Sequence, residues 1–294
     1  MASRAGAWFR ALRPHQWLKN ILVFVPAASA HRLFEREVAL AATVAFLLFG
    51  MCASGTYLFN DLMDLDADRR HPTKRHRPFA AGQLPLAHGY IAGATLVGCA
   101  LLLAAWLLGA WVFATLGIYV AASVWYSRAL KRIAMVDVLT LAALYSIRVI
   151  GGSTATRIIP SFWLLAFTMF IFLSLATAKR YAELKLMLAS GNTQASGRGY
   201  SVDDAPLLQS CGVATGYISV LVLALYVNSN VAELLYSRTT LLWLLCPLLL
   251  YWITRVWIKT SRGQMNDDPV VFALLDRPSL AVAFIALVLV GAAS

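Results

Sequence analysis

The sequence is poor in acidic residues and in cysteine. Its 294 residues include 14 Asp and Glu against 25 Lys and Arg, which gives a formal net charge of +11. The four cysteines stand singly in apolar stretches, so neither a disulfide framework nor a zinc site is indicated. Only 13% of the residues are charged, and 60% are hydrophobic. We therefore expect a membrane protein whose positive charge attracts anionic lipid head groups. We do not expect a nucleic-acid partner.

Several uncharged runs approach the ~20 residues that a membrane-spanning helix requires. The polar stretches between them are too short to fold alone, the largest being residues 60–87 and 179–206. The sequence predicts an all-α integral membrane protein of nine transmembrane helices, forming a single transmembrane domain over residues 1–294. The expected spans are residues 18–30, 39–59, 88–107, 109–126, 134–152, 161–178, 207–228, 240–256 and 277–293.

The Lys and Arg residues are distributed unevenly between alternate connecting segments. With a cytoplasmic N-terminus, the inner segments hold 20 of the 25 and the outer loops hold four, while Arg148 lies inside the fifth span. Because cytoplasmic loops carry this excess, we predict a cytoplasmic N-terminus. The expected location is the inner membrane of a bacterium. Polar residues at the inner ends of the even-numbered helices predict a cytoplasmic-side polar chamber. Arg148 is either a functional intramembrane charge or a side chain that snorkels to the outer boundary.

An acidic cluster closes the second predicted helix. Asp61, Asp64, Asp66 and Asp68 lie within eight positions. At ~100° per residue, Asp61, Asp64 and Asp68 share one helical face while Asp66 points away. The helix macrodipole disfavours acidic groups at a C-terminus, so solvation alone explains the cluster poorly. Carboxylates beside cations suit a Mg²⁺ ion that shares a diphosphate with the protein.

Three motifs carry a resemblance to a known family. The pattern Asn60-Asp61-x-x-Asp64-x-x-x-Asp68 resembles the first Asp-rich motif of the UbiA superfamily of membrane prenyltransferases. Arg13-Pro14 and Tyr126-Ser127-x-x-Leu130-Lys131-Arg132 resemble further signatures of that superfamily. The resemblance covers nearly the whole chain and implies a UbiA-type bundle of nine transmembrane helices. It also implies that the first motif binds Mg²⁺ and a donor diphosphate, which Lys131 contacts.

The segment after the sixth predicted helix departs from the family pattern. Most members place a second Asp-rich motif there, whereas this sequence reads Ala178-Lys179-Arg180-Tyr181-Ala182-Glu183. Two cations and one acid suit a donor that bears more phosphate. This segment is similar to the polyprenyl-phosphate (decaprenyl-phosphate) phosphoribosyltransferase branch. Two other motifs are similar to the same branch, namely His71-Pro72-Thr73-Lys74-Arg75-x-Arg77-Pro78 and Gly197-Arg198-Gly199-Tyr200-Ser201.

This resemblance implies a Mg-dependent glycosyltransferase of the pentosyltransferase class. It takes phosphoribosyl diphosphate as donor and a polyprenyl phosphate as acceptor, and it makes a precursor of cell-envelope polysaccharide. Loops 60–87 and 179–206 are expected to cap the site, and a homo-oligomer is compatible with the sequence. The predicted metal ligands and catalytic residues are Asp61, Asp64 and Asp68. The predicted substrate-binding residues are Lys19, Asn60, Lys74, Arg75, Arg77, Tyr126, Lys131, Asp137, Lys179, Arg180, Glu183 and Arg198.

Two alternatives to this function stay open, and so does the role of Asp137. That residue either forms an ion pair with Arg128, Lys131 or Arg132, or accepts hydrogen bonds from ribose hydroxyls. A conventional prenyltransferase would keep the metal site and take an allylic diphosphate and an aromatic acceptor. A cation transporter would place carboxylates at mid-membrane on broken helices, whereas the acids here cluster at one surface.

Overall fold

The computed structural model describes residues 4–71, 73–189, 199–265 and 269–294. Within these ranges every regular element is a helix, and no strand is present. The chain divides into two compact units. The first unit comprises Met1–Arg128 and Ile147–Ile159, and the second comprises Ala129–Ser146 and Pro160–Ser294. The prediction of a single domain over the whole chain stays a prediction.

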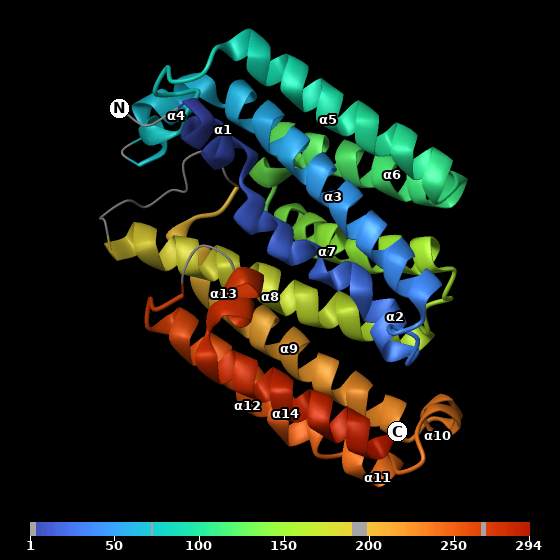
Figure 1. The fold of residues 1–294 in the computed structure, drawn as a ribbon. Helices are drawn as coiled ribbons and strands as arrows, with labels where there is room; N and C mark the ends of the chain where they lie inside the picture. Colours follow the sequence, from blue (N-terminus) through green and yellow to red (C-terminus); the bar gives the residue numbers. More distant parts are fainter. Residues whose placement is uncertain (1–3, 72, 190–198, 266–268) are drawn as a thin grey trace. The chain divides into compact units, whose positions relative to one another are not determined.

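The first unit is built around α3 (Arg36–Met63), which carries no charge from Val38 to Asn60. A helix that is apolar on all sides is typically buried among other helices or in lipid. It packs against α5 (Leu86–Leu107), α6 (Ala110–Arg128) and the 3₁₀ helix η1 (Pro14–Phe24), as Figure 1 shows. The shorter elements of this unit are α1 (Arg4–Leu12), α2 (Val25–Ser29), α4 (Leu65–Arg70) and η2 (Lys74–His76).

Glycines allow backbone contacts inside the first unit. A Cβ atom on Gly152 would lie 2.0 Å from the carbonyl oxygen of Val23, and one on Gly55 would lie 2.9 Å from that of Gly93. Gly152 belongs to α7 (Val136–Thr156), which begins in the second unit and ends in the first. Small residues matter in membranes because lipid provides no hydrophobic force between helices, so close packing must hold them. The contacts of α7 with η1 and of α3 with α5 therefore require glycine.

The second unit is a bundle around α8 (Phe162–Ala189) and α9 (Ala205–Val227), which lie along each other. The helix α12 (Leu245–Ser261) packs against both. A buried hydrogen-bond chain joins the three, because Ser174 donates to the Gly212 carbonyl at 2.6 Å and accepts from Trp257 Nε1 at 3.1 Å. The remaining elements are η3 (Leu130–Arg132), η4 (Val202–Asp204), α10 (Asn230–Leu235), α11 (Thr239–Leu242), α13 (Pro269–Leu275) and α14 (Arg277–Ala293).

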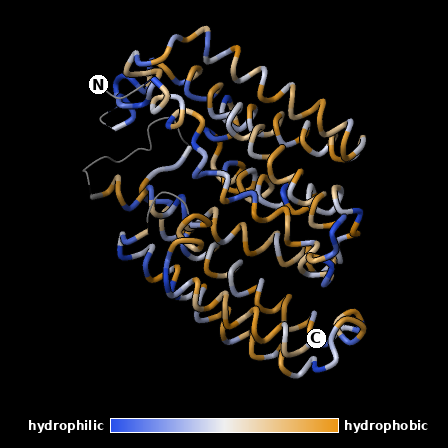
Figure 2. The backbone as a smooth tube through the Cα atoms, in the orientation of Figure 1, coloured by the Kyte–Doolittle hydropathy of each residue, from blue (hydrophilic) through white to orange (hydrophobic). Residues whose placement is uncertain are grey.

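The long helices coincide with the predicted spans. Among the described residues, seven helices are long and apolar enough to cross a membrane, and an eighth span results if α13 and α14, which meet at 76°, act together. Figure 2 shows these helices as mostly hydrophobic and the segment after α3 as hydrophilic. The predicted first span, residues 18–30, folds as η1 followed by the five-residue α2. Its role as a ninth transmembrane helix stays a prediction, and so does the cytoplasmic-side chamber.

Candidate active site

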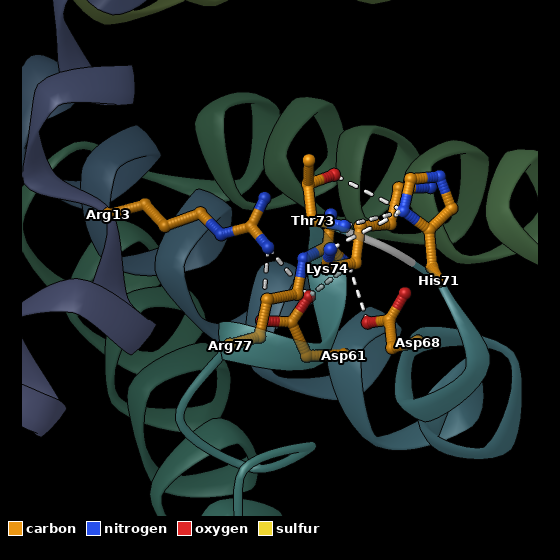
Figure 3. A network of polar contacts seen from close by, with 7 residues as sticks. All are labelled: Arg13, Asp61, Asp68, His71, Thr73, Lys74 and Arg77. Atoms are coloured by element: carbon orange, nitrogen blue, oxygen red, sulfur yellow. Dashed lines mark hydrogen bonds and ion pairs between the residues drawn. The ribbon is translucent and has the colours of Figure 1, made fainter.

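Asp61, near the end of α3, and Asp68, in α4, face two arginines in the first unit, as Figure 3 shows. Arg13 Nη2 donates to Asp61 Oδ1 at 2.7 Å and to Oδ2 at 3.0 Å. Arg77 Nη1 donates to Asp61 Oδ1 at 3.1 Å and to Asp68 Oδ2 at 2.7 Å. The aspartates are 2% and 3% exposed, whereas the side chains of Arg13 and Arg77 keep 20% and 24% of their surface exposed. The cluster is thus a buried pair of carboxylates that two partly exposed cations contact.

A break in the helix lies between the two aspartates. Asp64, with φ −93° and ψ 11°, separates α3 from α4. The prediction that the three aspartates share one face of an uninterrupted helix is therefore wrong, because the backbone of Asp64 leaves the helical conformation. Asp61 and Asp68 still converge, since both accept a hydrogen bond from the same nitrogen of Arg77. Asp64 is half-buried, and Asp66 is exposed.

The loop after α4 presents Arg77 to the carboxylates. His71 Nδ1 accepts hydrogen bonds from the backbone N–H groups of Thr73 at 3.3 Å and Lys74 at 3.4 Å, which Figure 3 shows. The N–H of Arg77 then donates to the Lys74 carbonyl at 2.9 Å. These bonds fold the segment into a turn that directs Arg77 inward, while Lys74 and Arg75 are exposed on η2.

Arg13 reaches the cluster from a backbone position in the left-handed region. It has φ 52° and ψ 54° between α1 and η1. For a residue other than glycine, this conformation raises the free energy by about 1 kcal/mol. Its guanidinium carbon also lies 5.2 Å from the centroid of the Tyr57 ring. The sequence marks Arg13 only through the Arg13-Pro14 signature. Burial, and then the charges of Arg13 and Lys19, lower the pKa of the nearby His15.

The carboxylates are suited to a divalent cation that shares its coordination with a substrate. Among the described residues, no three His, Cys, Asp or Glu side chains are grouped closely enough to hold a metal ion by themselves, and the predicted ligand set of Asp61, Asp64 and Asp68 stays a prediction. Asp61 and Asp68 nevertheless direct oxygens at one cationic nitrogen of Arg77. Mg²⁺ is commonly held by one or two carboxylates together with water and substrate phosphates. Two converging carboxylates fit that mode of binding.

Other predicted residues of the first unit lie on separate elements. Asn60 is half-buried beside Asp61 in the last turn of α3, and Tyr126 is half-buried near the end of α6. Lys19 is buried on η1, with 7% of its surface exposed. The predicted substrate contacts of these three residues stay predictions.

Arg148 forms a second polar centre in the first unit. Its Nε donates to Asn20 Oδ1 at 3.0 Å, and its Nη2 donates to the Tyr119 hydroxyl at 3.0 Å. The side chain is 5% exposed, and its guanidinium carbon lies 4.9 Å from the centroid of the Tyr119 ring. Snorkelling is therefore wrong for Arg148, because neighbouring side chains hold the guanidinium inside the unit. Sequence reasoning flagged this charge in an apolar helix but not its partners.

Arg180 is the centre of an ion cluster in the second unit. Its Nε and Nη2 donate to the two oxygens of Asp137 at 2.6 Å and 2.9 Å, and its Nη1 donates to the Glu183 carboxylate. Arg180 and Asp137 have no exposed surface. Asp137 therefore forms an ion pair, with a partner 43 residues away that no local spacing indicated. Because both groups are enclosed, neither meets a ligand in this arrangement.

Gly199 and Tyr200, shortly before α9, contact the loop of Lys131. Tyr200, which is 4% exposed, accepts a hydrogen bond on its hydroxyl from the N–H of Met135 at 2.8 Å. Ser201 N–H donates to Asp204 Oδ2 at 2.8 Å, and the two form a capping box. Lys131 is half-buried on η3, and Lys179 is half-buried next to Arg180 in α8. Arg198 lies outside the described residues, so its predicted role stays a prediction.

Comparison with known proteins identifies relatives of this chain. Residues 21–288 match the model of the UbiA prenyltransferase family. A protein of Azorhizobium caulinodans, nodulation protein NoeC, is 36% identical over 275 residues, which cover 92% of this chain and 87% of that protein. A protein of Sinorhizobium fredii, uncharacterized protein y4nM, is 37% identical over 277 residues, covering 92% of this chain and 53% of that protein.

A further relative is named as an enzyme. The decaprenyl-phosphate phosphoribosyltransferase of Mycobacterium tuberculosis is 39% identical over 186 residues, which cover 62% of this chain and 61% of that enzyme. The matched regions thus span about half of the S. fredii relative and about three fifths of the M. tuberculosis relative.

The fold has a solved counterpart. A UbiA homolog from Archaeoglobus fulgidus, solved with GPP and Mg²⁺, superposes with a TM-score of 0.70 over 98% of this chain and 99% of that chain, at 15% identity. This likeness concerns the fold. The apolar helices and the family model together identify a multi-pass membrane protein. Since the matched region covers nearly the whole sequence, as the motif at Asn60–Asp68 predicted, the chain belongs to the UbiA prenyltransferase family.

Proposed function

We propose that the protein transfers a 5-phosphoribosyl group from phosphoribosyl diphosphate to a polyprenyl phosphate and releases diphosphate. The observation that carries the proposal is the pair Asp61 and Asp68 facing Arg13 and Arg77. A diphosphate leaving group needs carboxylates that hold a metal and guanidinium groups that bind phosphate oxygens. Similarity to the M. tuberculosis phosphoribosyltransferase over 62% of the chain supports this donor and acceptor.

The arginines and the aspartates of the first unit have different proposed roles in the reaction. In the reaction, the bond between ribose C1 and a diphosphate oxygen breaks, and diphosphate leaves with the electron pair. An oxygen of the lipid phosphate forms the new bond to C1. Arg13 and Arg77 bind phosphate oxygens, because a guanidinium presents paired donors that match them. Asp61 and Asp68 would hold Mg²⁺, which neutralises charge on the leaving group.

No side chain is needed as a general base. A phosphate monoester is anionic near neutral pH, so the lipid acceptor is already a nucleophile. Orientation of the two substrates and charge stabilisation then supply the acceleration. Asn60, Asp64, Lys74, Arg75 and Tyr126 remain proposed contacts around this centre. Lys19, Lys131, Lys179 and Arg198 remain proposed substrate contacts as well, without a place assigned to them relative to this centre.

We revise the proposed roles of three residues of the second unit. Arg180 was predicted to bind the sugar donor, and Asp137 was predicted either to form a local ion pair or to accept hydrogen bonds from ribose hydroxyls. In the structure each is fully buried against the other. We therefore propose that Arg180, Asp137 and Glu183 hold segments of the second unit together, and that Lys131 and Lys179 are the residues of this unit that contact substrate phosphate.

The reaction is proposed for the cytoplasmic face of a bacterial inner membrane. Twenty of the 25 Lys and Arg residues fall in segments that lie on one side when the N-terminus is cytoplasmic. An exported polysaccharide needs a lipid-linked sugar made at the face where the soluble donor is available. The product is therefore proposed as a precursor of a cell-envelope polysaccharide.

A two-donor assay tests this function against the prenyl transfer that the family name suggests. Purified protein with Mg²⁺ receives radiolabelled phosphoribosyl diphosphate and polyprenyl phosphate in one arm. In the other arm it receives radiolabelled prenyl diphosphate and an aromatic acceptor. We expect label in the lipid only in the first arm, and none with Asp61→Asn. Label incorporated only in the second arm would assign the protein to conventional prenyl transfer.

A further inference from the structure

The loop that carries Lys131 is held in place by a segment distant in sequence. Lys131 lies in η3, and the chain then passes through Arg132, Ala134 and Met135 into α7. Gly199 lies directly on this loop: a Cβ atom there would be 2.4 Å from the Arg132 carbonyl oxygen and 2.8 Å from the Ala134 nitrogen. The two backbones therefore touch at a point where no side chain fits.

The hydroxyl of Tyr200 forms a hydrogen bond with the same loop. The hydroxyl accepts from the Met135 N–H at 2.8 Å, and the ring is buried in a cluster with Leu184 and Leu208. Met135 has φ 63°, in the left-handed region that side chains disfavour. A residue in such a conformation persists only where its surroundings impose it. The bond from Tyr200 is one such restraint, four residues from Lys131.

The buried ion cluster also contacts Tyr200. The guanidinium carbon of Arg180 lies 5.8 Å from the centroid of the Tyr200 ring, and the same guanidinium holds Asp137 in the first turn of α7. The capping box of Ser201 and Asp204 anchors the chain after Tyr200 to the start of α9. The loop of Lys131 is thus fixed at its contacts with Gly199 and Tyr200 and at Asp137.

We propose that Gly199 and Tyr200 are positioning residues that hold the η3 loop so that Lys131 meets the phosphates of the donor. This inference rests on the proposed function only in naming the donor. It explains why glycine and tyrosine follow each other at this point: glycine permits the backbone contact, and tyrosine supplies an acceptor from a buried ring. Neither residue needs to touch a substrate.

A double-mutant cycle between Tyr200 and Lys131 tests the proposal. Tyr200→Phe keeps the buried ring and removes the acceptor, and we expect the KM for the donor to rise about fivefold, the value of one hydrogen bond, with kcat little changed. Lys131→Ala should raise that KM by a larger factor, about 10–100-fold, because a charged contact is lost. In the Lys131→Ala background, Tyr200→Phe should then change the KM by less than about twofold, since the group it positions is gone.

The controls separate positioning from general damage. Tyr217→Phe removes another hydroxyl of the second unit, one that lies 3.0 Å from Thr254 Oγ1 and is remote from η3 in sequence, and it should leave the KM unchanged. Hydrogen–deuterium exchange of the peptide containing Met135 should accelerate in Tyr200→Phe and not in Tyr217→Phe. An equal effect of Tyr200→Phe in both backgrounds, or unchanged exchange at Met135, would overturn the proposal.

The cycle remains informative if the donor has been misidentified. Diphosphate release is measured with whichever donor the wild-type protein uses in the two-donor assay. A wild-type protein that uses only prenyl diphosphate contradicts the proposed function, and the cycle is then run with that donor. Additive effects in an active protein contradict the positioning role alone.

Discussion

The two units each contain an arginine–aspartate cluster, and the clusters differ in access to water. In the first unit, Arg13 and Arg77 keep 20% and 24% of their side-chain surface exposed while they contact buried carboxylates. In the second unit, Arg180 and Asp137 are both fully enclosed. The same residue types therefore serve two purposes. A partly exposed guanidinium is able to exchange its partner for a ligand, whereas an enclosed ion pair holds segments of chain together.

Removal of the enclosed arginine should give the largest effect. Arg180→Met leaves Asp137 as a buried charge without its bidentate partner, which should lower the stability by about 3–5 kcal/mol. The measurement is the thermal unfolding midpoint of the protein in detergent. The double variant Arg180→Met with Asp137→Leu removes both charges and should recover much of the loss. A single variant as stable as the wild type would remove the distinction between the clusters.

Removal of a carboxylate in the first unit should affect activity and not folding. Asp61→Asn weakens the proposed metal site and the contacts of Arg13 and Arg77, so transfer should fall by on the order of 100-fold or more. The rate is measured over a range of Mg²⁺ concentrations, with the melting midpoint recorded in parallel. Asp66→Asn is the matched control, because Asp66 is 87% exposed in the same segment. Equal loss in both variants would contradict the special role of Asp61.

A conservative change at a partly exposed arginine should give the smallest effect. Arg77→Lys keeps the positive charge between Asp61 and Asp68 but loses the paired donors of the guanidinium. We expect the KM for the donor to rise about tenfold, the value of one charge-assisted hydrogen bond, without loss of stability. Arg69→Lys, at a side chain 52% exposed, is the control. A fall in stability instead of a rise in KM would make this cluster structural as well.

The sequence predicts the long helices well, because a run of about twenty apolar residues in a membrane must satisfy its backbone hydrogen bonds internally, and a helix does so. The spans predicted from residue 39 onward all fall on helices. The 3₁₀ form of η1 was not predictable, since a short stretch containing Pro26 and Lys19 gives no clear helical period. The break at Asp64 was missed for a related reason: Asp64 continues the acidic spacing, and no proline or glycine marks the interruption.

The ion partners were less accessible to sequence reasoning. Asp61 and Asp68 were placed together by spacing, but Arg13 lies 48 residues from Asp61, and Arg148 lies 128 residues from Asn20. Tertiary packing creates these pairs, and one sequence contains no signal of it. The block Gly199-Tyr200 was noted as part of a family resemblance, and its contacts with Arg132 and Met135 give a physical reason for both residues.

The backbone contact at Gly152 has a consequence for the opposite end of η1. With the Val23 carbonyl 2.0 Å from where a methyl group would sit, Gly152→Ala must push that end of η1 aside. A 3₁₀ helix rises about 2 Å per residue, so η1 spans roughly 20 Å between Val23 and Arg13. We expect the displacement at Val23 to move Arg13 as well, so that a single methyl group misaligns Arg13 with Asp61 while leaving every charged side chain chemically intact.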